Sequence, residues 1–114
     1  MLKPDDPRDL AMNLLHRSVC NVQVGAVVVD GYGKIMGWGW NHSGPTGLGL
    51  CAERHAIRRC NADRLHGAVM VVAGRWRKTG KIVTARPCAK CQAVLRKKGM
   101  LAMYRNQDGK WEVL

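Results

Sequence analysis

The sequence predicts a layered α/β domain in which helices cover a β-sheet. Segments with helical periodicity alternate along the chain with short β-branched runs, in the order α-β-β-α-β-α-β-β. Helices interleaved with strands in this way favour a sheet that is covered by helices. A chain of 114 residues has room for one hydrophobic core, so a single domain over residues 1–114 is expected.

The N-terminal elements are placed by apolar periodicity and by the residues that start each element. Asp6 is a suitable N-cap and Pro7 suits the first helical position, and an apolar stripe follows as far as Val19. The next run is rich in valine, which indicates a strand buried on both faces, and a turn rich in glycine returns it as a hairpin. The expected elements are a helix at 7–19, strands at 22–29 and 34–40, a glycine-rich loop at 41–49 and a helix at 50–61.

The C-terminal half is expected to continue with a buried strand and a basic loop. Pro87 then opens a helix, and Gly99 ends it as a C-cap. A three-residue turn at 107–109 joins the last two strands, which forces them to be antiparallel. The expected elements are a strand at 68–73, a loop at 75–86, a helix at 87–98 and strands at 100–104 and 111–114.

Composition restricts the classes of function. Lys and Arg number 19 against 8 Asp and Glu, and the resulting net charge of +11 points to phosphate-bearing partners. No apolar run approaches the roughly 20 residues that span a bilayer, and the first residues do not resemble a signal peptide. The five cysteines are therefore expected in a reducing cytoplasm, where closely spaced cysteines are metal ligands more often than disulfides.

Two short segments contain the residues suited to chemistry. The first is Cys51-Ala52-Glu53, and the second, Pro87-Cys88-Ala89-Lys90-Cys91, begins 34 residues after Glu53. Both are predicted at helix N-termini, where free amides and the helix dipole stabilise thiolates. Three thiolates are a suitable ligand set for zinc, and Glu53 lies near enough to reach a water on the metal. The expected ligands are Cys51, Cys88 and Cys91.

This pair of segments resembles the zinc signature of the cytidine and deoxycytidylate deaminase superfamily. Cys51 stands where other branches have histidine, as in the free-nucleoside cytidine deaminases. Residues 24–30 and 37–41 are similar to the first hairpin of the deoxycytidylate and tRNA-adenosine branches. The resemblance implies a three-layer α-β-α fold with a five-stranded mixed sheet. It also implies a C-terminal antiparallel hairpin, which is typical of the free-nucleoside branch.

The resemblance further implies a role for each residue of the site. Zinc would activate a water, and Glu53 would carry its proton to the ring and later to the departing amine. Arg54 matches an arginine that hydrogen-bonds the ligand sulfurs and offsets their negative charge. The expected substrate contacts are Asn41 toward the sugar and Ala52 toward the base through its backbone, together with Val24 and His42. Free-nucleoside enzymes carry an aromatic residue and a glutamate where this chain has Val22 and Ser43.

The expected function is hydrolytic deamination of cytosine to uracil in free (deoxy)cytidine or its nucleotide. The first alternative is a deaminase that acts on cytosine, or on tRNA adenosine, within single-stranded DNA or RNA. Between Arg54 and Lys98 there are 13 basic residues against one acid, and Trp76 lies among them, which suits a single strand. A second alternative is a nucleic-acid-binding module with structural zinc, in which His55 would complete a Cys₃His shell. A homo-oligomer is expected.

Overall fold

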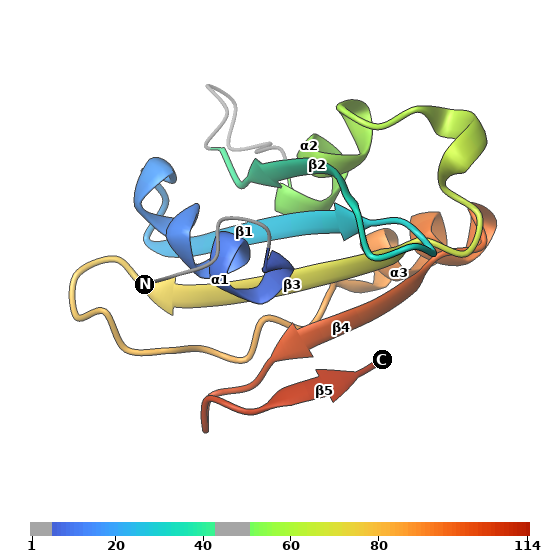
Figure 1. Ribbon diagram of the computed structural model, residues 1–114. Helices are drawn as coiled ribbons and strands as arrows, with labels where there is room; N and C mark the ends of the chain where they lie inside the picture. Colours follow the sequence, from blue (N-terminus) through green and yellow to red (C-terminus); the bar gives the residue numbers. More distant parts are fainter. Residues whose placement is uncertain (1–5, 43–50) are drawn as a thin grey trace.

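A computed structural model of the protein describes residues 6–42 and 51–114 (Figure 1). The expected loop at 41–49 is therefore described only at its first two residues. In chain order the helices and strands are α1 (Pro7–Asn13), β1 (Val22–Val29), β2 (Ile35–Trp40), α2 (Ala52–Arg58), β3 (Val69–Trp76), α3 (Ala89–Lys97), β4 (Leu101–Arg105) and β5 (Trp111–Val113). Two short 3₁₀ helices, η1 (Leu15–Arg17) and η2 (Ala62–Arg64), follow α1 and α2.

The strands form one mixed sheet in the order β2-β1-β3-β4-β5. Only β3 and β4 are parallel, and the last two strands form the antiparallel hairpin that the sequence predicts. Helix α1 covers one face of the sheet, whereas α2 and α3 cover the other (Figure 1). The expected three-layer α-β-α class is confirmed.

The core lies on both faces of the two central strands, because successive side chains of a strand point to opposite faces. Ala26 and Val28 of β1 pack toward α2 and α3, whereas Val27 and Val29 pack toward α1. Residues 26–28 are fully buried, as a β-branched run without polar alternation predicts.

Two glycines allow α2 to lie directly against the edge strand β2. A Cβ atom at Gly39 would lie 2.6 Å from the Ala56 backbone nitrogen, and one at Gly37 would lie 2.9 Å from the Ala56 carbonyl oxygen. Real Cβ atoms do not come so close to a helix backbone, so any larger residue would push α2 away. This close packing sets the position of the N-terminus of α2, which carries Cys51 and Glu53.

The first helix is shorter than predicted. It ends at Asn13, and the chain continues as the 3₁₀ turn η1. A helix to Val19 would leave only two residues in which to reverse direction before β1, and a 3₁₀ turn achieves the reversal sooner. Val19 is consequently 67% exposed and does not belong to the apolar stripe.

Strand β3 is longer than predicted, so the expected loop begins at residue 77 instead of 75. Arg75 Nε donates a hydrogen bond of 2.8 Å to Gln23 Oε1, and Trp76 pairs with Val22 of β1. These cross-strand contacts keep two polar or exposed residues in the sheet. Among the described residues, no helix is long and apolar enough to cross a membrane.

Candidate active site

Three cysteine thiols converge where α2 and α3 begin. Cys51 and Cys88 are the N-cap residues of these two helices, and Cys91 lies in the first turn of α3. The three Sγ atoms all lie within 4.8 Å of one another. Tetrahedral zinc with bonds of about 2.3 Å holds sulfurs about 3.8 Å apart, so shifts of about 1 Å would close the site. Three protein ligands leave the fourth position open, as in catalytic zinc sites.

The surroundings of the thiols suit a metal-binding cluster. The backbone N–H groups of Cys91 and Lys90 lower the pKa of the exposed Cys88 thiol, as expected at a helix N-terminus. Burial raises the pKa of the Cys91 thiol, and the neighbouring Glu53 raises it further. A bound cation would lower the pKa of both thiols, because a coordinating thiol is deprotonated.

Arg54 lies on the outer side of the cluster. Its Nη2 atom donates a hydrogen bond of 3.4 Å to Cys51 Sγ. Three thiolates around Zn²⁺ carry a formal charge of −1, and this guanidinium offsets part of it. The position is the one that the resemblance implies for Arg54.

Glu53 is the acid of the site, and its side chain is only 6% exposed. Burial raises the pKa of its carboxyl, while interactions with Cys91 and Arg54 oppose the rise. A carboxyl with a raised pKa is better suited to accept and return a proton near neutral pH. Glu53 therefore has the burial and the neighbours that a proton carrier beside the metal ligands requires.

A cavity of about 220 Å³ opens onto Glu53 and two of the thiols. Glu53 is the only acid and Arg86 the only cation among the described residues that line it. The cavity is small compared with the roughly 300–1,000 Å³ of drug-sized ligand sites, so it suits a single ring system with the rest of the ligand outside. Its lining residues are Val22, Val24, Asn41, Cys51, Ala52, Glu53, Val83, Thr84, Ala85, Arg86 and Cys88.

Asn41 lies in this lining with its side-chain amide held against β1. Its Oδ1 atom accepts hydrogen bonds from Val24 N at 2.9 Å and Ser18 Oγ at 2.6 Å. Its Nδ2 atom donates to Val22 O at 2.8 Å. An amide nitrogen has two hydrogens, so one donor of Asn41 is left for a ligand. Val24 and Ala52 also line the cavity.

His42 and His55 lie together on the outer side of β2. His42 Nε2 is 3.2 Å from His55 Nδ1, and the described lining of the cavity does not include His42. His55 Nδ1 is also 3.2 Å from the backbone nitrogen of Trp40. Its ring is therefore directed at β2, and the metal-ligating group among the described residues contains the three cysteines without a histidine. Ser43 lies outside the described residues.

The sequence did not single out four residues that line the cavity. They belong to the stretch after the basic turn, which folds back on β3 through the bond from Val83 N to Gly74 O. That stretch carries no motif, so only its position just before the second zinc-binding segment could have indicated it. The four are Val83, Thr84, Ala85 and Arg86.

Comparison with known proteins identifies the family and the fold. The family model described as the cytidine and deoxycytidylate deaminase zinc-binding region matches residues 8–105. The cytidine deaminase from Burkholderia pseudomallei aligns with a TM-score of 0.75 over 99% of this chain and 92% of that chain, at 22% identity. The dCMP deaminase from the cyanophage S-TIM5 aligns with a TM-score of 0.66 over 92% and 86%, at 24% identity. The Mycobacterium leprae cytidine deaminase aligns with a TM-score of 0.62 over 99% and 94%, at 20% identity. No curated protein matches significantly.

Proposed function

Because the chain belongs to the cytidine and deoxycytidylate deaminase family, a zinc-binding family, we propose that it converts the cytosine of free (deoxy)cytidine or its nucleotide to uracil. The reaction is a hydrolysis that consumes water and releases ammonia. One observation carries this proposal: a buried glutamate and three converging thiols lie together at a cavity sized for one ring system.

The chemistry follows from the positions of the side chains. Zinc on the three thiolates supplies a Lewis acid that lets water act as a nucleophile near neutral pH. Glu53 takes a proton from the attacking water and delivers it to the ring nitrogen N3 as the oxygen bonds to C4. Glu53 then takes the proton of the new hydroxyl on C4 and transfers it to the amino group, so that the C4–N bond breaks, ammonia leaves and the C4 carbonyl of uracil forms. Its burial excludes bulk water from both transfers.

The other lining residues hold the substrate. Val22 and Val24 provide an apolar wall for the base, and the free Asn41 donor is available to a sugar hydroxyl. His42 is proposed to act from outside the cavity, at the sugar or phosphate end of the ligand. Ala52 presents backbone next to Glu53, where the exocyclic groups of the base would lie.

Arg86 supports a nucleotide as the substrate. Its side chain is exposed at the cavity, and its guanidinium has no hydrogen-bond or ion-pair partner among the described residues. A phosphate gives an arginine a bidentate partner. We therefore expect Arg86 to contact the phosphate of (d)CMP.

The test is a panel assay with the zinc-loaded protein. Cytidine, deoxycytidine, CMP, dCMP and adenosine are incubated separately, and the deaminated products are quantified. Arg86→Gln should lower kcat/KM for dCMP about tenfold or more, from the loss of a charged hydrogen bond, with little change for deoxycytidine. Arg58→Gln, an exposed site on α2 outside the cavity, is the control of equal charge. Adenosine turnover with no cytosine turnover would refute the proposed substrate.

We also propose a homo-oligomer in the cytoplasm. Apolar side chains are exposed on β4 and at the C-terminus, including Leu101 at 62% and Val113 at 75%. Cys51, Cys60, Cys88 and Cys91 form no disulfide, which suits a reducing compartment. Sedimentation at the monomer mass across micromolar concentrations would contradict the oligomer.

A further inference from the structure

The cavity that opens onto Glu53, Cys51 and Cys88 is called the zinc pocket from here on. A second cavity, of about 470 Å³, has a different composition. One aromatic side chain and two lysines dominate it, with no acid among its described lining residues. The Trp76 indole is 47% exposed there. The lining residues are Asn21, Trp76, Lys78, Thr79 and Lys81, and we call this cavity the Trp76 pocket.

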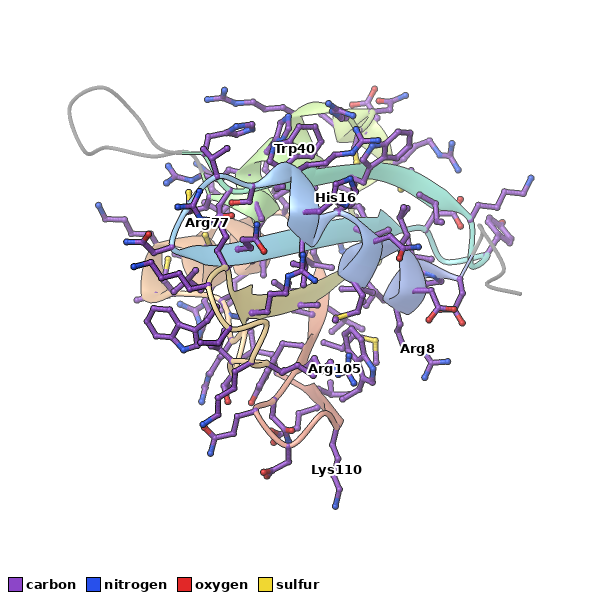
Figure 2. All side chains as sticks on the ribbon, turned by 90° about the vertical axis from the view of Figure 1, so that its left-hand side faces the viewer. Arg8, His16, Trp40, Arg77, Arg105 and Lys110 are labelled. Atoms are coloured by element: carbon purple, nitrogen blue, oxygen red, sulfur yellow. The ribbon has the colours of Figure 1, made fainter. Side chains whose placement is uncertain are left out.

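The Trp76 pocket is built on a well-bonded turn. Trp76 N donates to Lys81 O at 2.9 Å, and Gly80 N donates to Trp76 O at 2.8 Å. Gly80 adopts a φ of 72°, which favours glycine at this position. Arg77 N donates to Asn21 O at 2.9 Å, which ties the turn to the residue before β1. Figure 2 shows Arg77 at the end of the sheet where β1 begins. The turn thus holds both lysines, which follow Trp76 in sequence, in the same cavity lining as the indole.

The charges around the pocket are uncompensated. Residues 75–86 contain five basic side chains and no acid. The ammonium groups of Lys78 and Lys81 have no ion-pair or hydrogen-bond partner in the part of the chain that the structure describes. An aromatic face flanked by free cations is the combination that binds the base and backbone of a single strand.

The two pockets adjoin each other on the same face of the sheet. Trp76 pairs across the ladder with Val22, which lines the zinc pocket. Lys81 and Val83 are two residues apart on the stretch that returns along β3, so their Cα atoms are separated by about 7 Å. Asn21 of the Trp76 pocket also directly precedes Val22 of the zinc pocket in the chain. A ligand that fills both pockets would therefore be a short strand.

We propose that the Trp76 pocket binds the nucleotide that neighbours the reacting one in single-stranded nucleic acid. The neighbouring base stacks on Trp76, and Lys78 and Lys81 contact its phosphate. This inference rests on the proposed function in one respect, namely that a cytosine base enters the zinc pocket. It extends the substrate from a free nucleotide to a cytosine within a strand.

Binding is measured without turnover, on the zinc-loaded Glu53→Gln protein, by fluorescence anisotropy of a labelled 12-nucleotide single strand with one central cytosine. Trp76→Leu should weaken binding about tenfold, since base stacking on an aromatic is worth about 1–3 kcal/mol. Trp76→Phe keeps a stacking face and should bind within about threefold of the parent. Lys78→Gln with Lys81→Gln should reduce the slope of log K against log salt by about 0.7, because the two lysines contact one phosphate of a single strand.

The matched control is Lys34→Gln with Lys110→Gln, which removes the same charge at two exposed sites outside both pockets. An equal change in salt slope in this control would overturn the proposal in favour of unspecific attraction. If dCMP competes as strongly as the unlabelled oligonucleotide, and if this competition depends equally on Trp76, the pocket binds free nucleotides. That result would also overturn the proposal. Unchanged oligonucleotide binding in Trp76→Leu would likewise overturn the proposal.

Failure of the proposed function is a separate outcome. Oligonucleotide binding that depends on Trp76, in a protein that deaminates no cytosine substrate, would support the Trp76 pocket and refute the deaminase. Turnover of dCMP without binding of the single strand would support the deaminase and refute the proposed role of the Trp76 pocket.

Discussion

Substitution of Gly39 by alanine tests the packing that positions the site. The new Cβ would lie 2.6 Å from Ala56 N and 2.8 Å from His55 Cβ. Both contacts are too short, and the first is with helix backbone, which cannot rotate aside. Helix α2 must therefore move away from β2, and Cys51 and Glu53 move with it.

The magnitude follows from the cost of overpacking. Extra methyl groups in a packed core cost about 1–3 kcal/mol, and the backbone contact places Gly39→Ala near the upper end. For a domain of this size each kcal/mol lowers the Tm by about 4–8 °C, so a loss of about 12 °C or more is expected. Zinc affinity should fall as well, because one of its three ligands is displaced.

The assay is thermal unfolding of the zinc-loaded protein, followed by circular dichroism, with zinc content measured in parallel. Gly31→Ala is the matched control, since a Cβ there meets nothing within 4 Å and the backbone does not have a positive φ. Gly31→Ala should leave the Tm unchanged or slightly raised. A Tm for Gly39→Ala within about 3 °C of the parent would refute the argument that this glycine sets the position of α2.

Three further predictions concern the metal and the hairpin turn. Cys88→Ala should lose zinc and much of the folded state, because the metal joins two helices; full zinc stoichiometry by elemental analysis would contradict this. Arg54→Gln should lower zinc affinity about 10–100-fold in chelator competition, with the fold unchanged by circular dichroism. Backbone donation, chiefly from Lys34 N, and the Arg64 guanidinium lower the pKa of Asp30. Asp30 therefore stabilises the fold above its unfolded pKa, and this contribution is lost as pH falls through the folded pKa. Urea unfolding from pH 7 to pH 3 should show a shallower loss of stability for Asp30→Asn than for the parent; parallel curves would contradict the assignment.

Local signals in the sequence were sufficient for much of the fold and for the metal ligands. The β-branched run of β1 predicted its bounds without error, because burial on both faces leaves no polar alternation. The spacing of Cys88 and Cys91 at a helix start, with Cys51 at another, predicted thiols that the fold brings together. Helix geometry places Cys88 and Cys91 on one face, whereas the approach of Cys51 to them is a long-range contact that the family resemblance implied.

Long-range contacts account for what the sequence did not reveal. The last strand residues of β3 depend on a hydrogen bond from Arg75 to Gln23, 52 positions away. Arg86 reaches the cavity because the chain folds back along β3. Apolar periodicity in the sequence does not predict this return. The contact of His42 with the substrate stays a prediction, because its ring lies against His55 and the described lining of the cavity does not include it.

The central claim is that Glu53 transfers protons in a zinc-dependent deamination of cytosine. The direct measurement is ammonia release from dCMP by the zinc-loaded protein and by Glu53→Gln, each checked for one zinc per chain. The parent should release one ammonia for each uracil nucleotide formed, and Glu53→Gln should be slower by about 10²-fold or more. Equal rates in the two proteins, at equal zinc content, would contradict the claim.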